Sequence, residues 1–321
     1  MTTSELVPNV PRRSLVIPVY KNEGSLPELM SACAELQKMS GDLEVVFVVD
    51  GSPDGCFSWL QRELPKQPFV SQLCLHSRNF GSFAAIRSGF SVARGEVLAV
   101  MAADLQEPIE LAHAFFERLL RNEGDVAIGV RERRDDPALS SLASRVFWGL
   151  YRRVVLPEIP AGGVDMFGCT REVKEHLLAL EERNSSLVGQ LFWVGFRRIE
   201  VPYVRRDRKH GVSAWTFSKK VRYLFDSVYA FSDLPIRALK WIGGFSVAVA
   251  ALVSVVVLGF RLAGQIDVPG YTAIILAVMF FGGLNALGLG VVGEYLWRTF
   301  ENTKRRPLSI IAKKQSFDGV R

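Results

Sequence analysis

The stretch LEVVFVVDGSPD, residues 43–54 of a chain of 321, decides the fold class. Its first part, residues 43–49, is rich in valine and predicts a short strand that is buried on both faces. Its second part, Asp50 to Asp54, has the Asp, Gly, Ser and Pro residues of a turn. A buried strand that ends in a polar turn is typical of a parallel sheet, whose ligands bind at the carboxyl ends of the strands.

Similar segments flank this stretch. Residues 14–19 (SLVIPV) and 96–101 (EVLAVM) are predicted to form further buried strands. Helical stretches are predicted between the strands, over residues 26–39, 57–64 and 84–93. This alternation predicts an α/β domain with a mostly parallel, Rossmann-like sheet and helices on both of its faces.

Polar clusters follow three of the predicted strands. They are Tyr20 to Glu23, Asp50 to Asp54 and Asp104 to Gln106. Because parallel strands end at the same edge of a sheet, we expect the three clusters to converge there and to form the binding site.

Two uncharged stretches, residues 241–260 and 268–293, are each long enough for a helix that crosses a hydrocarbon core of about 30 Å. The link between them is short and polar, so we expect a two-helix transmembrane hairpin over residues 241–297; two buried core helices are the alternative. Lys and Arg flank the outer ends of the hairpin, whereas only Arg261 lies near the link. The positive-inside rule therefore predicts that the N-terminal domain and both termini are cytoplasmic.

The segments around the hairpin complete the predicted organisation. It consists of a sheet domain (1–215), a juxtamembrane amphipathic helix (216–240), the hairpin (241–297) and a basic cytoplasmic tail (298–321). The amphipathic helix is expected either to lie in the membrane interface or to pack on the domain. Gly282, Ala286 and Gly290 place small side chains on one face of the second span, which predicts close packing within the hairpin or between subunits of a homo-oligomer.

The charge and the cysteines narrow the classes of function. The formal net charge is +6, and basic residues cluster beside the hairpin, which predicts attraction to anionic membrane lipids rather than to nucleic acid. The four cysteines are isolated from one another, a spacing that fits neither a zinc site nor a disulfide framework. The GxGxxG pattern at residues 288–293 lies in an apolar run with no preceding strand, which argues against a dehydrogenase.

Six motifs in a fixed order point to one family. They are IPVYKNE (17–23), VVDGSPDG (48–55), SRNFGSFAAIRSG (77–89), ADLQEP (103–108), GVR (129–131) and RKHGVS (208–213). With the membrane hairpin, they resemble the family-two glycosyltransferases of the GT-A fold over the whole chain. The resemblance is greatest to the polyprenyl-phosphate branch, which includes dolichol-phosphate mannose synthase and the bactoprenol-phosphate sugar transferases.

This resemblance implies an enzyme that transfers a sugar, with inversion, from a nucleotide sugar to a polyprenyl phosphate. Uridine diphosphate is the commonest nucleotide in this branch, and undecaprenyl or dolichyl phosphate is the expected acceptor. The reaction would take place at the cytoplasmic face of a bacterial inner membrane and would serve glycan, lipopolysaccharide or cell-wall modification.

The resemblance also implies a divalent metal ion, Mg²⁺ or Mn²⁺, bound to the donor diphosphate. Family members bind it through a D-x-D-x-Q motif, and this chain has Ala102, Asp104 and Gln106 at those positions. Asp104 and Gln106 are therefore the expected metal ligands, and Asp104 is an expected catalytic residue. A helix N-cap is the alternative for Asp104.

The earlier motifs correspond to the nucleotide-sugar site of the family. Asp50 resembles the acid that accepts hydrogen bonds from the base, although Val49 stands where many relatives carry a second aspartate. A turn residue is the alternative for Asp50. The expected residues of this site are Pro18, Tyr20, Glu23, Asp50, Ser52, Arg78 and Gly81.

The acceptor phosphate needs to be bound and oriented by the enzyme more than it needs a general base. A lipid phosphate is already an anion near neutral pH, because its second pKa is about 6, and arginine forks suit the task of orienting it. Asp165 resembles the family's acid near the sugar and is expected to be catalytic, as a base or as an orienting group. The expected phosphate-binding residues are Arg131, Arg145, Arg205, Arg208 and Ser213.

Other classes of function stay open at this point. A non-catalytic nucleotide-sugar-binding membrane protein is consistent with the acids missing at positions 49 and 102. A glycosyltransferase with a different lipid acceptor is consistent with the same motifs. A processive polysaccharide synthase is disfavoured, because the chain contains no Q-x-x-R-W motif.

Overall fold

The computed structural model describes residues 11–132, 149, 151–153, 155–160, 163–206, 217–263 and 270–320. Its helices and strands are β1 (Arg13–Val19), α1 (Leu26–Ser40), β2 (Leu43–Val49), α2 (Cys56–Glu63), β3 (Val70–His76), α3 (Ser82–Val92), β4 (Val97–Val100), α4 (Ile109–Leu120), β5 (Val126–Arg131), β6 (Phe167–Thr170), α6 (Arg171–Ala179), α7 (Leu187–Trp193), β7 (Arg198–Tyr203), α8 (Phe217–Phe231), α9 (Leu234–Leu262), α10 (Tyr271–Thr303) and β8 (Ile311–Phe317). The strands and helices predicted in the N-terminal part all occur, with bounds that differ by one or two residues.

The strands form one sheet in the order β7-β5-β6-β4-β1-β2-β3-β8. The central strands β4, β1, β2 and β3 are parallel, as predicted. Strands β6 and β8 instead run antiparallel to their neighbours, while β5 and β7 are parallel to each other. Because β6 and β8 are reversed, the residues that precede them lie at the edge where the parallel strands end.

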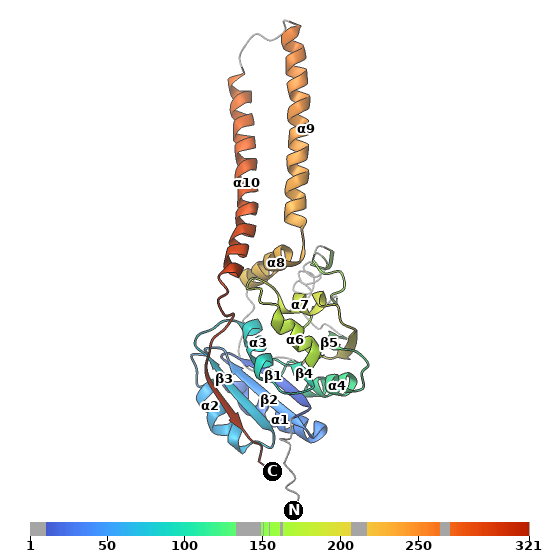
Figure 1. Cartoon of the computed structure of the whole chain (residues 1–321), viewed down its shortest axis with the longest axis vertical. Helices are drawn as coiled ribbons and strands as arrows, with labels where there is room; N and C mark the ends of the chain where they lie inside the picture. The colour runs from blue at the N-terminus through green and yellow to red at the C-terminus, as the bar shows by residue number, and fades with distance from the viewer. Residues whose placement is uncertain are drawn as a thin grey trace, which may run out of the picture.

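Helices cover both faces of this sheet (Figure 1). In β2, Val45, Phe47 and Val49 pack on one face with α1, α2 and α4. Val46 and Val48 pack on the other face with α3, α6 and α7. Burial on both faces explains why the sequence of β2 is continuously apolar rather than alternating.

Helices α9 and α10 lie side by side and extend away from the sheet domain (Figure 1). Within the described residues, the segment Ala277–Thr303 of α10 is long and apolar enough to cross a membrane. The predicted first span lies in α9, and its insertion stays a prediction. Large apolar side chains are exposed along both helices, among them Trp241, Phe245, Leu252, Val255, Ile274, Met279 and Leu289.

The predicted amphipathic segment 216–240 is divided between two helices. Helix α8 ends at Phe231 and α9 begins at Leu234, because Ser232 Oγ accepts a hydrogen bond from the Leu234 backbone N at 3.0 Å. Helix α8 packs on the sheet domain through four apolar side chains, those of Tyr223, Leu224, Val228 and Phe231. Phe225 is 56 % exposed. The described part of α8 therefore packs on the domain and also exposes an aromatic side chain.

The prediction of a basic tail over residues 298–321 is corrected by the C-terminal strand. Helix α10 continues to Thr303, and β8 then pairs antiparallel with β3 (Figure 1). Without β8, the backbone of β3 would present unpaired N–H and C=O groups at the edge of the sheet. Lys313 and Lys314 stay exposed on this strand, so a basic segment can also complete the sheet.

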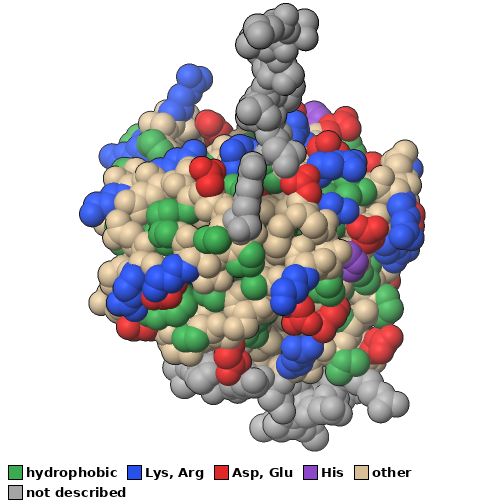
Figure 2. Space-filling model, turned by 90° about the horizontal axis from the view of Figure 1, so that it is seen from below, with side chains coloured by type: hydrophobic (Ala, Val, Ile, Leu, Met, Phe, Trp, Pro, Cys, Tyr) green, Lys and Arg blue, Asp and Glu red, His purple; other side chains and the backbone are tan. Residues whose placement is uncertain are grey.

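One arginine fixes α10 to the rest of the chain. Arg298 pairs with Asp226 of α8 at 2.7 Å and with Glu294 at 2.8 Å, and it donates to the carbonyl oxygen of Asn184 at 3.2 Å. Its guanidinium also lies 4.9 Å from the ring centre of Tyr229. These contacts orient the sheet domain relative to α10. The opposite end of the domain shows interspersed basic and acidic side chains (Figure 2).

The small-residue face of α10 has no partner within 4 Å at its two glycines. A Cβ built at Gly282 or Gly290 would meet no atom of the described chain within that distance. Neither position therefore packs closely against the described part of α9, and the predicted contact between subunits stays a prediction.

Candidate active site

Strand direction brings the predicted site residues to one edge of the sheet. Asp50 follows β2, Asp104 follows β4, and Arg131 is the last residue of β5. Asp165 lies just before the reversed strand β6, and Tyr203 ends β7, which is parallel to β5. Positions that are far apart in the sequence therefore lie together where the parallel strands end.

Asp50 is the centre of a buried hydrogen-bond network. Its Oδ1 accepts from the backbone N of Phe80 and its Oδ2 from that of Gly81, both at 2.8 Å. His76 Nδ1 lies 2.8 Å from Asp50 Oδ1, and His76 Nε2 lies 2.8 Å from Ser88 Oγ. Asp50 is 2 % exposed, so its carboxylate holds the loop after β3 in place. Direct contact between Asp50 and a nucleotide base stays a prediction.

The loop after β3, residues 78–81, is called the β3 loop below and contains two predicted nucleotide-binding residues. The Arg78 guanidinium lies 4.2 Å from the ring centre of Phe80, and Gly81 has a φ of +97°. Gly51, with a φ of +57°, lets the turn after β2 approach this loop closely. A Cβ at Gly51 would lie 2.3 Å from the carbonyl carbon of Arg78, so the approach requires glycine.

Hydrogen bonds tie the segment after β1 to the turn after β2. Ser52 Oγ accepts from the backbone N of Lys21 at 2.8 Å and donates to Asp54 Oδ1 at 2.6 Å. Glu23 Oε2 accepts from the backbone N of Gly55 at 2.9 Å. Ser52 and Glu23, both predicted to border the nucleotide, thus shape the wall of the site.

The backbone is strained at two of the strand ends. Lys21 and Leu105 have φ values of +55° and +56°, in a region that costs a non-glycine residue roughly 1–2 kcal/mol. Lys21 follows Tyr20, which is 36 % exposed, at the end of the strand that contains Pro18. Leu105 follows Asp104 directly. Such strain is concentrated at binding sites, which supports a functional role for both strand ends.

Asp104, Glu107 and Asp165 form an acidic cluster at this edge. Glu107 is 2 % exposed, and its Oε2 has no hydrogen-bond partner among the described residues. Burial, and after it the charges of Asp165 and Asp104, raises the pKa of Glu107 to about 7, against an opposing effect of Arg205. Crowded acids with an unsatisfied buried oxygen are typical of a site that binds a cation or carries out chemistry.

Arg131 and Asp165, two of the predicted site residues, form an ion pair. Arg131 Nε and Nη2 each lie 2.5 Å from Asp165 Oδ2, and the Tyr203 hydroxyl donates to the same oxygen at 2.8 Å. Burial is the largest single influence and lowers the pKa of Arg131, but the charge and hydrogen bond of Asp165, together with Tyr203, outweigh it and leave that pKa raised. Burial and the charge of Asp165 also raise the pKa of Tyr203, so its hydroxyl keeps the proton that it donates. Asp165 thus orients the Arg131 guanidinium.

The predicted metal ligands fit a divalent ion only in part. Gln106 Oε1 accepts from Arg205 Nη2 at 2.7 Å, so Arg205 would compete with a metal ion for this oxygen. Asp104 fits better, because Mg²⁺ is commonly held by one or two carboxylates together with substrate phosphates. Within the described ranges, no group of three or more His, Cys, Asp or Glu could hold a metal ion. Of the two expected ligands, Asp104 is the one whose carboxylate suits a metal that is also held by a diphosphate.

The predicted phosphate-binding residues are only partly brought together. Arg205 Nε lies 3.9 Å from Glu107 Oε1 without a hydrogen bond, so the half-buried Arg205 side chain lies between Gln106 and Glu107. Arg131 reaches the site, as described above. Arg145, Arg208 and Ser213 lie outside the residues that the structure describes.

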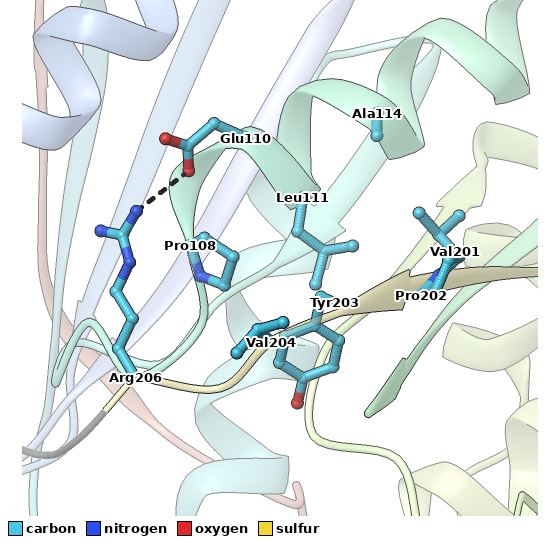
Figure 3. A pocket seen from close by; sticks show the side chains of 9 residues that line it. All are labelled: Pro108, Glu110, Leu111, Ala114, Val201, Pro202, Tyr203, Val204 and Arg206. Carbon is cyan, nitrogen blue, oxygen red and sulfur yellow. Dashed lines mark hydrogen bonds and ion pairs between the residues drawn. The ribbon is translucent and has the colours of Figure 1, made fainter. Parts of the chain in front are cut away.

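A surface hollow of about 440 Å³ lies beside this cluster, between α4 and the end of β7 (Figure 3). Arg206 and Glu110, 3.5 Å apart, border one side of it. Its lining residues are Pro108, Glu110, Leu111, Ala114, Val201, Pro202, Tyr203, Val204 and Arg206. The hollow shares only Tyr203 with the polar residues described above, so it is an apolar flank and not the site itself.

Four residues of this edge are missing from the sequence-based predictions: His76, Ser88, Glu107 and Tyr203. Glu107 and Ser88 stand inside the quoted motifs, so a closer reading of those motifs could have found them. His76 has no metal-like spacing to another histidine, and Tyr203 belongs to none of the quoted motifs. Only the fold brings these last two to the site.

Comparisons with known proteins agree with this geometry. A model of glycosyl transferase family 2 matches residues 14–178. The protein CsbB of Bacillus subtilis (strain 168) is 35 % identical over 301 residues, which cover 93 % of this chain and 90 % of CsbB. The bactoprenol glucosyl transferase of Shigella phage SfII is 31 % identical over 301 residues, which cover 94 % of this chain and 97 % of that protein.

Among solved structures, the mannosyltransferase PcManGT from Pyrobaculum calidifontis, in complex with GDP-Man and Mn²⁺, is 18 % identical with a TM-score of 0.49, over 89 % of this chain and 87 % of that one. The family match and the near full-length relatives agree with the mixed α/β sheet of the GT-A type. This chain therefore belongs to glycosyltransferase family 2.

Proposed function

We propose that this chain transfers a sugar from a nucleotide sugar, with uridine diphosphate as the leaving group, to a polyprenyl phosphate at the cytoplasmic face of the membrane. The observation that carries the proposal is the Arg131–Asp165 pair beside Asp104 at the edge where the parallel strands end. A positioned arginine supplies N–H donors for a phosphate, and an acid after a strand supplies a ligand for a diphosphate-bound metal. Relatives named bactoprenol glucosyl transferases support undecaprenyl phosphate as the acceptor.

The donor is expected on the β1–β3 side of this edge. There the β3 loop and the turn after β2 are fixed to each other by the close approach of Gly51 and by Asp50. Arg78, Gly81 and Tyr20 border this region, in agreement with the family resemblance.

The mechanism needs little proton transfer on the acceptor side. The lipid phosphate is already anionic, and one of its oxygens attacks the anomeric carbon in line, so that the configuration inverts and the nucleoside diphosphate leaves. Arg131 binds the phosphate through donors that Asp165 and Tyr203 orient. Asp104 would hold the divalent ion, which supplies positive charge to the departing diphosphate when it is bound.

The membrane part delivers the acceptor. We propose that α9 and α10 cross the bacterial inner membrane as a hairpin and that the sheet domain and both termini are cytoplasmic. The exposed apolar side chains along both helices and the Lys and Arg residues at their outer ends support this topology. The carboxyl edge faces α10, since β8 starts opposite His76 shortly after α10 ends.

The competing function is a membrane protein that binds nucleotide sugars without turning them over. Binding and turnover should therefore be measured on the same purified sample, in vesicles that contain undecaprenyl phosphate. We expect labelled lipid from at least one of a panel of nucleotide sugars, and no labelled lipid with Asp104→Ala or with excess chelator. Nucleotide binding without turnover for the whole panel would establish the non-catalytic alternative.

The acceptor class can be tested in the same vesicles. Undecaprenyl phosphate, dolichyl phosphate and phosphatidic acid each present a lipid phosphate, but only the first two carry a polyprenyl chain. We expect labelled product with a polyprenyl phosphate and none with phosphatidic acid. Equal labelling of all three would show that the acceptor is recognised by its phosphate alone, which contradicts the polyprenyl assignment.

A further inference from the structure

The segment that returns from α10 reaches the end of β3. Strand β8 pairs antiparallel with β3, but the register shifts between Leu75 and His76. The backbone N of Ser77 donates to the carbonyl oxygen of Ile310 at 3.0 Å. This irregular pairing brings Ser309 next to α3, where its Oγ lies 2.7 Å from Ser88 Oγ.

A continuous chain of contacts connects Ser309 to the β3 loop. Ser88 Oγ lies 2.8 Å from His76 Nε2, and His76 Nδ1 lies 2.8 Å from Asp50 Oδ1. Asp50 accepts from the backbone N of Phe80 and Gly81, as described above. The His76 side chain is fully buried and also contacts the Phe80 ring edge-on, with 5.5 Å between the ring centres. We call Asp50, His76, Ser88 and Ser309 the His76 network.

The donors in the His76 network follow a fixed order when the imidazole is neutral. Asp50 is an acceptor only, so His76 Nδ1 must carry the proton that it donates. His76 Nε2 must then accept, which makes the Ser88 hydroxyl its donor. Ser88 Oγ is left to accept from the Ser309 hydroxyl. Each group therefore fixes the orientation of the next, from the segment after α10 to the amides of the β3 loop.

We infer that His76 and Ser88 are positioning residues that couple the segment returning from α10 to the β3 loop. The assignment of the β3 loop to the donor site rests on the proposed function, but the coupling itself does not. Asp50 accepts hydrogen bonds from the loop amides. His76 contacts Asp50 directly, and Ser309 contacts His76 through Ser88. Loss of any link leaves buried polar groups unpaired and loosens the loop.

The coupling is tested first without any nucleotide, by amide hydrogen exchange on the full-length protein in detergent. We expect the Phe80 and Gly81 amides to exchange about tenfold faster in His76→Leu and several-fold faster in Ser309→Ala. Ser316→Ala in β8 is the matched control in the segment that returns from α10 and should leave this exchange unchanged. Unchanged exchange at residues 80 and 81 in Ser309→Ala, with the protein folded, would overturn the inference.

The consequence for the donor is tested with uridine diphosphate and magnesium. We expect His76→Leu to weaken binding about tenfold and to raise the KM for the nucleotide sugar, with kcat within about twofold of the wild type. His76→Asn keeps an amide donor near the Nδ1 position and should restore most of the affinity. A fall in kcat with unchanged KM contradicts the positioning role.

Failure of the coupling and failure of the proposed function give different results. If the wild type does not bind uridine diphosphate, but Ser309→Ala speeds the exchange of the β3 loop amides, the donor assignment is wrong and the coupling holds. If the wild type transfers sugar, but Ser309→Ala and His76→Leu leave the exchange of the β3 loop amides unchanged, the proposed function holds and the coupling is wrong.

Discussion

The His76 network and the acidic cluster lie at the same edge of the sheet but differ in how completely their polar groups are paired. In the His76 network, both oxygens of Asp50 and both ring nitrogens of His76 have partners within the protein. In the acidic cluster, Glu107 Oε2 and Arg205 Nε are buried without a hydrogen-bond partner in the described chain, and three carboxyl groups crowd together.

This difference indicates what each region does. A fully paired network is rigid before any ligand arrives, which suits a wall that presents loops to a nucleotide. A crowded acidic cluster lowers the stability of the fold when it is empty. It is stabilised most by a bound cation and by groups that pair with its arginines. Under the proposed function, the donor side of this edge is preorganised, whereas the acidic cluster is completed by its ligands.

The largest effect is expected for Asp104→Ala. Removal of the carboxylate takes away the protein's ligand for a diphosphate-bound metal, so the rate of sugar transfer should fall on the order of 10³-fold. Glu110→Gln is the matched control, because Glu110 is an exposed acid at the start of α4. It should leave the initial rate of labelled-lipid formation unchanged. Full activity of Asp104→Ala in excess chelator would contradict the metal-dependent mechanism.

Gly51→Ala tests whether the donor side of the sheet edge is rigid. The new Cβ would lie 2.3 Å from the Arg78 backbone at a left-handed φ, so the free energy of unfolding should fall by about 3 kcal/mol, measured by thermal unfolding. Gly41→Ala also places a Cβ at a positive φ, +78°, but this Cβ meets no described atom within 4 Å, so the substitution should cost only about 1 kcal/mol. Equal losses for the two variants would mean that the close approach is unimportant.

Asp165→Asn tests whether Arg131 must be oriented by a charged carboxylate or only by a polar side chain of the same size. The ion pair is lost, so kcat/KM for the polyprenyl phosphate should fall on the order of 100-fold. Tyr203→Phe removes one donor to Asp165 and leaves the Arg131 contacts, so we expect a loss of only about threefold. The idea fails if Tyr203→Phe is as damaging as Asp165→Asn.

Glu107→Gln reports on the crowding of the acidic cluster through pH. The folded pKa of Glu107, about 7, exceeds that of an unfolded glutamate, so its contribution to stability is present below about pH 4.5 and is lost as pH rises through 7. In excess chelator, Glu107→Gln should therefore flatten the fall in stability between pH 5 and 8 and be more stable at pH 8 by on the order of 2 kcal/mol. A wild-type slope in this variant, as expected for the Glu110→Gln control, would contradict the buried, protonated state.

The strands of the sheet could be predicted because their apolar runs are buried by helices on both faces. The valine run of β2 and its polar turn are sufficient to place Asp50 at the carboxyl edge. The reversed strands could not be predicted in this way. Strand β6 has a short sequence, and β8 is polar and basic, so neither has an apolar pattern that distinguishes it from a loop.

The roles of the expected site residues stay predictions, and the contacts that the structure shows among them could not be predicted from the sequence. Arg131 and Asp165 are far apart in the sequence. The reversal of β6 places Asp165 beside the end of β5, where its Oδ2 accepts from Arg131. The buried position of Glu107 depends on packing around it, and the link from His76 to Ser309 joins residues separated by more than half of the chain. Such tertiary pairings carry no local sequence signal.

The most direct test of sugar transfer is a product analysis in vesicles with undecaprenyl phosphate and a labelled α-linked uridine diphosphate sugar. Inverting transfer predicts a β-linked sugar on the lipid phosphate, formed in a one-to-one ratio with released uridine diphosphate, and no such lipid with Asp104→Ala. Release of uridine diphosphate without labelled lipid, or a lipid whose sugar keeps the α configuration, would contradict it.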